Sequence, residues 1–202
     1  MVKSKEKNTR QKIIETAAHL FHLHGVKGTS VDDILKASKT GKSQFYHYFR
    51  SKDRIIREVV TYHLSTILEN RRKALLQIRT LDEFEGFIQR EIAPKNQDCR
   101  GGCPFGTMAN EMSESDEVLR KELVGVFNQM EESIALTFSL LQAKGELDET
   151  ADPESLAQFF ISVLQGSMLL SKTGHDPQPM RNAFQHFMSY LRKHVPTPVQ
   201  TT

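Results

Sequence analysis

The chain has 202 residues, of which 38% are hydrophobic and 26% charged. That length suits one large globular domain, or a small domain beside a larger one. The net charge of +2 conceals an asymmetry: residues 1–57 carry 13 Lys and Arg against 5 Asp and Glu, and the remainder carries 14 against 20. A basic head on an acidic body indicates that only the head meets a polyanion, although a solvated basic surface would have the same composition.

Several classes of protein are excluded by what the chain lacks. No run of about 18 apolar residues is present, so we expect no membrane-spanning helix and no membrane partner. Residues 1–12 are charged and lack the apolar core of a signal peptide. Two cysteines in a chain of this length do not make a disulfide scaffold. We therefore expect a cytoplasmic protein.

Strand-like alternation is scarce, and the pattern predicts an all-α fold. Residues 2–8 are expected to form a frayed basic arm, which is either a minor-groove contact or a solubilising tail. A first helix is expected over residues 9–24, ended by Gly25. Its three histidines, with no Cys or acid near them at a suitable spacing, do not predict a metal site, and no cofactor is expected. Its apolar stripe consists of Ile13, Ala17, Leu20 and Phe21.

Residues 29–52 predict two short helices joined by a tight turn, with a third helix starting after it. Ser30 is a good N-cap, with Asp33 at the capping-box position. In the second short helix, residues 42–49, the aromatic side chains recur at i, i+3 and i+4 and predict an inward face. Its other face is rich in hydrogen-bond donors, as a recognition helix of a helix-turn-helix requires. These donors are Lys42, Ser43, Gln44, Tyr46 and His47.

We expect this region to contact DNA in two ways, at the phosphate backbone and at base edges, and Ser43 is a further candidate contact. The hydroxyl of Thr29 and the first amides of the Ser30 helix are expected at a phosphate, since a helix N-terminus binds anions. Gln44 and His47 are the candidates for reading base edges. The candidates for other backbone contacts are Lys42, Tyr46, whose ring also fits simple packing, and Lys52.

The pattern TSVDDI, a turn, KSQFYHYF and then SKD resembles the DNA-binding head of the TetR (tetracycline-repressor) family of bacterial regulators. Many members of that family carry Gly-Val-Ser at the turn, where this chain has Lys39-Thr40-Gly41. The resemblance implies a three-helix head over residues 1–52 and a six-helix body over residues 53–195, followed by a tail over 196–202. It also implies a double-stranded operator, a small-molecule effector and a homodimer.

The body opens with a predicted helix that runs from Ser51 to about Gln77. In the family this helix carries the effect of ligand binding to the head. A further helix is expected over residues 81–92, and a loop over residues 93–102. Residues 115–144 predict a long helix closed by Gly145.

Cys103 is expected to open a helix, with Pro104 at its first position. The end of a helix that carries free amides favours a thiolate. The segment GCPFGTMANE resembles a subset of the family in which Gly-Cys opens the sixth helix, and some members of that subset respond to electrophiles or oxidants. Cys103 is thus a candidate redox switch with Cys99 as its resolving thiol; the alternative is a small residue that lines the core.

Met and Phe side chains of the body suit an adaptable apolar pocket, although the same stripe is typical of plain core. Family context favours an effector site lined by Cys103, Phe105, Met108, Met112, Phe127 and Met130.

The last two of the nine expected helices, the eighth and the ninth, begin at Asp152-Pro153 and Asp176-Pro177. Both are apolar, and Gly166 allows close approach of a partner. In the family these two helices form the four-helix interface of the dimer; internal packing is the alternative.

The sequence therefore predicts a one-component transcriptional regulator, most simply a repressor released by a small apolar or thiol-reactive molecule. Two other classes stay open. One is an all-α enzyme with Cys103 as nucleophile, for which no activating His or acid is placed by the sequence. The other is a constitutive DNA-binding protein with a filled body.

Overall fold

The computed structural model describes residues 2–92, 99, 102–112 and 114–196, and these residues form helices, turns and no strand. The predicted all-α fold is confirmed. None of the described helices combines the length and the apolar character that crossing a membrane requires. Most of the predicted loop at 93–102 and nearly all of the predicted tail lie outside the described residues.

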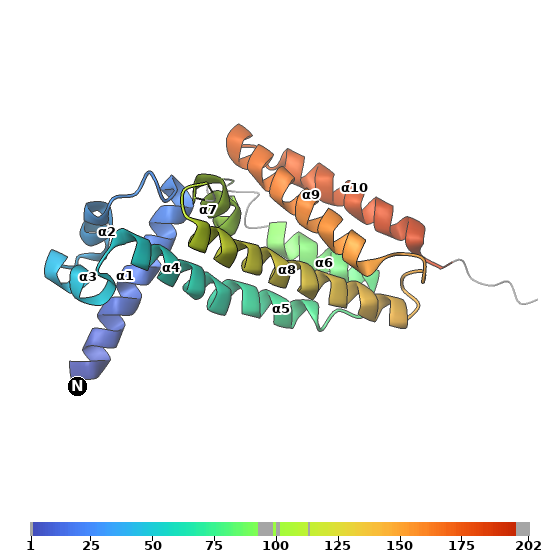
Figure 1. Cartoon of the computed structure of the whole chain (residues 1–202). Helices are drawn as coiled ribbons and strands as arrows, with labels where there is room; N and C mark the ends of the chain where they lie inside the picture. Colours follow the sequence, from blue (N-terminus) through green and yellow to red (C-terminus); the bar gives the residue numbers. More distant parts are fainter. Residues whose placement is uncertain (1, 93–98, 100–101, 113, 197–202) are drawn as a thin grey trace, which may run out of the picture. The chain divides into compact units, whose positions relative to one another are not determined.

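The chain forms two compact units, each built from two segments (Figure 1). The first unit consists of Met1–Leu68 and Cys103–Val124, and the second of Glu69–Gly102 and Gly125–Thr202. The first unit therefore contains the predicted head together with a segment from the predicted body.

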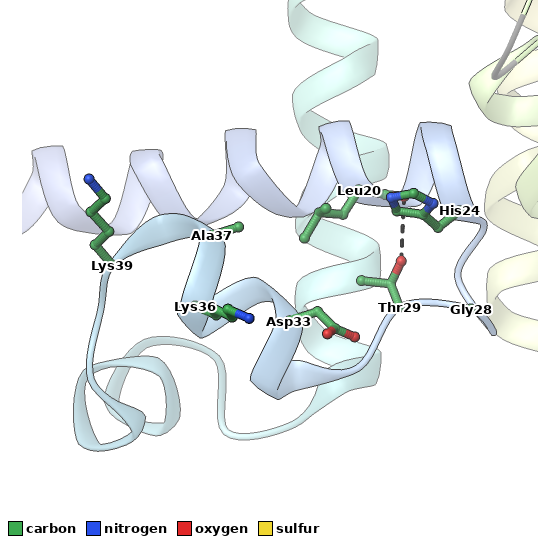
Figure 2. Close-up of a pocket in the computed structure, with 8 residues that line it drawn as sticks. All are labelled: Leu20, His24, Gly28, Thr29, Asp33, Lys36, Ala37 and Lys39. Carbon is green, nitrogen blue, oxygen red and sulfur yellow. Dashed lines mark hydrogen bonds between the residues drawn. The ribbon is translucent and has the colours of Figure 1, made fainter.

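The first unit has a core of aromatic and branched side chains. Its largest fully buried members are Ile13 and Phe21 of α1 (Val2–His24), Ile34 of α2 (Val31–Ser38), Phe45 and Phe49 of α3 (Lys42–Phe49), and Ile55 of α4 (Lys52–His63). Phe105 and Met108 of α7 (Pro104–Met112) are buried as well. Figure 2 shows the side of this unit where α1 and α2 meet.

The prediction of a frayed arm at residues 2–8 is wrong, because α1 begins at Val2. These residues contain no Pro or Gly, and Lys and Glu are good helix formers, so they extend the helix rather than form a loose arm.

The helix expected from Ser51 to Gln77 is also corrected. A π-helical turn, Leu64–Leu68, separates α4 from α5 (Glu69–Leu75). The Thr66 hydroxyl donates to the Tyr62 carbonyl at 2.6 Å, and the Ser65 hydroxyl donates to the same oxygen at 3.1 Å. Such side-chain bonds compete with the regular backbone ladder, which accounts for the irregular turn.

The second unit is a bundle of α5, α6 (Leu81–Ile92), most of α8 (Glu117–Ala143), α9 (Pro153–Gly174) and α10 (Gln178–Leu191), followed by a 3₁₀ turn, Arg192–His194. The helices α9 and α10 run side by side (Figure 1). Phe160 joins them, with its ring 5.6 Å from that of Phe184 and 5.2 Å from that of Phe187.

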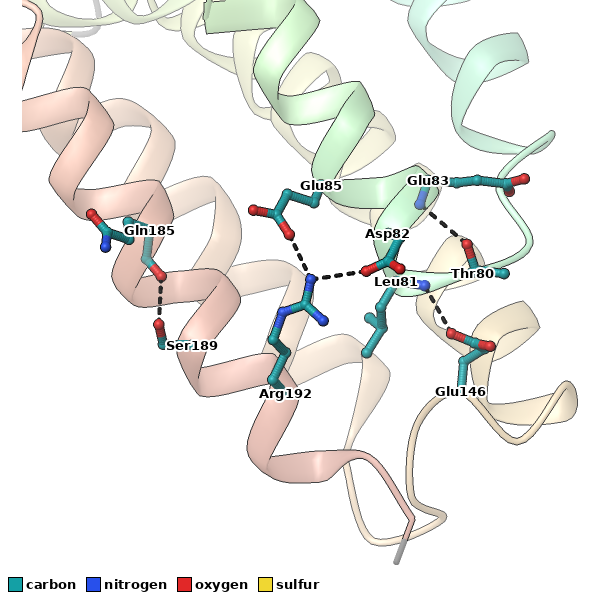
Figure 3. A network of polar contacts seen from close by, with 9 residues as sticks. All are labelled: Thr80, Leu81, Asp82, Glu83, Glu85, Glu146, Gln185, Ser189 and Arg192. Carbon is teal, nitrogen blue, oxygen red and sulfur yellow. Dashed lines mark hydrogen bonds and ion pairs between the residues drawn. The ribbon is translucent and has the colours of Figure 1, made fainter. Parts of the chain in front are cut away.

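Polar contacts tie the end of α10 to the start of α6 (Figure 3). The Arg192 guanidinium donates to Asp82 at 2.9 Å and to Glu85 at 2.6 Å. The carboxylate of Glu146 accepts from the backbone N–H of Leu81 at 2.9 Å, which satisfies one of the unpaired amides of the first turn of α6.

Candidate nucleic-acid interface

The first turn of α2 is held by a capping box. The Ser30 hydroxyl accepts from the Asp33 N–H at 3.1 Å, and the Asp33 carboxylate accepts from the Ser30 N–H at 2.8 Å. The hydrogen bonds from Ser30 hold the pKa of Asp33 below its ordinary value. The amides of Val31 and Asp32 come before the first intrahelical bonds, and they give α2 an anion-attracting end.

Thr29 lies beneath this cap, with only 2% of its surface exposed. Its hydroxyl donates to the Gly25 carbonyl at 2.8 Å and so closes the C-terminal end of α1. This burial does not support the phosphate contact that the sequence predicted for the Thr29 hydroxyl. The anion-attracting end of α2 therefore depends on the exposed Ser30 and on the backbone amides.

The turn between α2 and α3 places a lysine in a conformation that glycine adopts more easily. Lys39 has φ 54° and ψ 45°, in the left-handed region, which costs an L-residue about 1–2 kcal/mol. Gly41 has φ −84° and occupies the N-cap of α3. Gly41 therefore adopts a conformation that any residue can adopt, and the left-handed position of the turn is filled by Lys39 instead.

The helix α3 has the two faces that the sequence predicted. Phe45 and Phe49 are fully buried, and their ring centroids lie 5.3 Å apart. Tyr46 is 43% exposed, and it is flanked by other exposed polar residues of the same helix. These are Lys42, Ser43, Gln44 and His47.

Gln44 also caps its own helix. Its carboxamide oxygen accepts from the Gly41 N–H at 3.2 Å. An amide side chain has a donor group in addition to its acceptor, so Gln44 retains the NH₂ group for another partner. Its predicted contact with a base edge stays a prediction.

Lys52, predicted to clamp a phosphate, contacts the head itself. Its ammonium group donates to the Val26 carbonyl at 2.7 Å, and the residue is half-buried. An ammonium group has three donors, so this bond leaves donors for a phosphate. The same loop is contacted from a second side, because Glu111 of α7 accepts from the Lys27 N–H at 2.8 Å.

The sequence did not predict the contact between Glu111 and Lys27, because these residues are 84 positions apart. The local signal was the pair of glycines at 25 and 28. Gly25 has φ +77°, and the carboxylate of Glu111 lies where a side chain at that position would begin.

The residues predicted to line an effector pocket fall in both units. Phe105 and Met108 are buried in the first unit, and Met112 there is half-buried. Phe127 is half-buried and Met130 is buried in the second. A joint pocket stays a prediction.

Both cysteines are half-buried thiols. The carbonyl of Cys103 accepts from the Thr107 N–H at 2.9 Å, which is the first bond of α7. The predicted position of Cys103 at a helix N-terminus is confirmed; its redox function and that of Cys99 stay predictions.

Comparison with known proteins supports this architecture. Residues 13–59 match the family model of bacterial regulatory proteins of the tetR family, and residues 82–187 match a tetracyclin repressor-like C-terminal domain. An uncharacterised HTH-type transcriptional regulator from Lactococcus lactis is 32% identical over 93% of this chain and 95% of its own length.

Solved structures agree with these matches. The regulatory protein TetR from Rhodobacter sphaeroides has a TM-score of 0.83 at 27% identity, over 89% of this chain and 97% of that one. The regulator CifR in complex with 26-base-pair operator DNA has a TM-score of 0.76 at 20% identity, over 88% of this chain and 95% of that one. The chain belongs to the TetR family of bacterial regulatory proteins and is a DNA-binding transcriptional regulator.

Proposed function

We propose that the protein represses transcription in the cytoplasm by placing the exposed face of α3 in the major groove of an operator. The observation that carries this proposal is the two-faced construction of α3. Two fully buried phenylalanine rings fix the helix to the core, and five donor-bearing side chains face solvent. In this arrangement Gln44 and His47 read base edges, while Lys42, Ser43 and Tyr46 contact the backbone. Ser30 and Lys52 add phosphate contacts beside them.

A dimer presents two such heads to two half-sites, which lie one helical turn or a multiple of it apart. The complex of CifR with operator DNA supports this mode of binding, because the two chains share their fold. A ligand that binds more tightly to a second dimer shape would lower operator affinity by a population shift.

The effector that we propose is a small apolar or thiol-reactive molecule. Buried Met and Phe side chains around α7 suit an apolar molecule, and a thiol at the start of that helix suits an electrophile. Addition of the Cys103 thiolate to the C=C bond of an electrophile such as a maleimide forms a C–S bond and breaks the π bond, and the neighbouring carbon takes up a proton in place of the one that the thiol lost. The adduct adds volume beside the first bond of α7.

Electrophoretic retardation of the DNA upstream of the protein's own gene tests the proposal. We expect a shifted band at low ionic strength that disappears after treatment with N-ethylmaleimide and persists in a treated Cys103→Ser variant. Failure to retard this or any other duplex at low ionic strength would refute DNA binding. Unchanged retardation after mass spectrometry shows complete alkylation of Cys103 would refute the thiol-reactive effector.

A further inference from the structure

A groove of about 560 Å³ opens on the first unit between α1 and α2 (Figure 2). Leu20 and Ala37 supply its apolar surface. Its charged and titratable side chains are His24, Asp33, Lys36 and Lys39. None of the residues assigned to the exposed face of α3 lines this groove.

The cations of the groove are not balanced by its single carboxylate. Asp33 accepts two hydrogen bonds from Ser30, from its N–H at 2.8 Å and from its hydroxyl at 2.6 Å. These bonds, and secondarily the charges of Lys36 and His24, hold the pKa of Asp33 below its ordinary value, so one carboxylate faces two lysines. Lys36 and Lys39 are exposed, and within the described part of the chain neither ammonium group takes part in a hydrogen bond or an ion pair. The groove thus presents two lysines to an anion from outside the unit.

The backbone at Lys39 adds an independent observation. Lys39 adopts the left-handed conformation at φ 54°, where glycine or asparagine fits with less strain. Strained residues persist where the surrounding structure holds them, and they cluster at functional sites. A lysine side chain at this position supplies what glycine lacks, a positive charge at the turn that precedes α3.

We propose that Lys36 and Lys39 bind phosphates of the DNA backbone and so extend the contact surface beyond α3. This inference rests on the proposed function. Lys39 lies three positions before Lys42, which starts α3, and an extended chain spans at most about 3.6 Å per residue. The two lysines therefore begin within about 11 Å of each other. Two long side chains at that separation reach phosphates near one another on one strand.

The dependence of binding on salt concentration tests this proposal directly. The probe is a short duplex that the wild-type protein selects from a random-sequence pool. Each lost phosphate contact lowers the slope of log K against log salt concentration by about 0.9. Each variant loses one contact in each head of the dimer, so we expect a decrease of about 1.8 for Lys39→Asn and for Lys36→Gln. Binding at physiological salt should be several-fold weaker or more.

The choice of Lys39→Asn separates the effect of the lysine charge from the effect of backbone strain at residue 39. Asparagine tolerates the left-handed conformation, so Lys39→Asn removes the charge and keeps the turn. Its thermal midpoint should equal or exceed that of the wild type. Lys144→Gln, an exposed position of the second unit, removes the same charge away from the groove and should leave the slope unchanged.

Two results would overturn the inference, and they are distinguishable. If Lys42→Gln lowers the slope while Lys39→Asn and Lys36→Gln retain the wild-type value, the groove does not bind phosphate and the proposed function stands. If the wild-type protein binds no duplex at low salt, the inference and the proposed function fall together.

Discussion

His63 is a buried histidine without the hydrogen bonds that such residues normally make. It is 6% exposed, and neither ring nitrogen has a partner among the described residues. Its ring lies edge-on to Phe105, with centroids 5.8 Å apart. Burial, and secondarily the charge of His22, lowers the pKa of His63 from 6.5 to about 4. The imidazole is therefore neutral at physiological pH.

This depressed pKa predicts a loss of stability in mild acid. Between pH 6.5 and pH 4 the unfolded chain binds a proton at His63 and the folded chain does not, so the free energy of unfolding falls as pH falls. The loss should be on the order of 2–3 kcal/mol across this window. Denaturant unfolding at a series of pH values measures it.

A pair of variants isolates the contribution of His63. His63→Leu should flatten the curve between pH 6.5 and pH 4, whereas His186→Gln, an exposed position, should leave it unchanged. Equal pH dependence in the wild type and in His63→Leu would assign the acid sensitivity to other groups.

At the scale of elements, the loop between α1 and α2 contacts the C-terminal end of α7. Glu111 accepts from the Lys27 N–H at 2.8 Å. A Cβ at Gly25 would lie 2.1 Å from a carboxylate oxygen of Glu111, and Gly25 has φ +77°. The loop thus needs glycine for two reasons, its backbone conformation and the close approach of Glu111.

These two reasons can be separated by a double-mutant cycle. Gly25→Ala should destabilise the protein by about 1–3 kcal/mol, from both the clash and the conformational strain. Glu111→Ala should cost about 1 kcal/mol for its hydrogen bond. The double variant should cost less than the sum, since the clash is absent. Additive values within error in denaturant unfolding would show that Glu111 does not touch Gly25.

The sequence predicted the helices whose ends carry local signals. Pro104 at a first helical position and Asp152 at an N-cap each mark a helix start that the structure confirms. The π-helical turn at Leu64–Leu68 was missed, because Ser65 and Thr66 fit an ordinary helix pattern until their hydroxyls are seen to bond Tyr62.

In the candidate site, the sequence predicted which side chains of a helix are buried, but it did not predict the contacts between different helices and loops. Burial of Phe45 and exposure of Gln44 follow from helical spacing. Three other contacts depend on which helices and loops pack together in the folded chain. They are the hydrogen bond of the buried Thr29 hydroxyl to Gly25, the bond from Lys52 to Val26 and the contact of Glu111 with Lys27. The spacing of residues along the sequence carries no information on these tertiary contacts.

At the scale of the whole molecule, α9 and α10 leave large apolar side chains exposed. Phe159 is 44% exposed and Leu170 is 61% exposed, and eleven residues of helix place them on one face of α9, with Gly166 between them. Tyr190 of α10 is 41% exposed, and its ring lies 5.5 Å from that of Phe159. Such a surface fits a self-complementary interface between two copies of the chain.

A charge in this surface should separate the dimer. Leu170→Glu would bury an unpaired carboxylate in the interface, so we expect a monomer by analytical ultracentrifugation at micromolar concentration. Operator affinity should fall by about 100-fold or more, because two linked heads become two separate ones. Gln185→Glu, an exposed position of α10, should remain dimeric. A dimeric Leu170→Glu variant would place the interface elsewhere.

Reading of a duplex by the exposed face of α3 is the property on which the proposed regulation depends. It is tested most directly by measuring the affinities of Gln44→Ala and Lys42→Ala for a selected duplex and for a random one. Gln44→Ala should lose about 1–3 kcal/mol on the selected duplex alone and so lower the ratio of the two affinities. Lys42→Ala should weaken both equally and retain the ratio. An unchanged ratio in Gln44→Ala, or equal losses from both variants on both duplexes, would show that the exposed face of α3 does not read base edges.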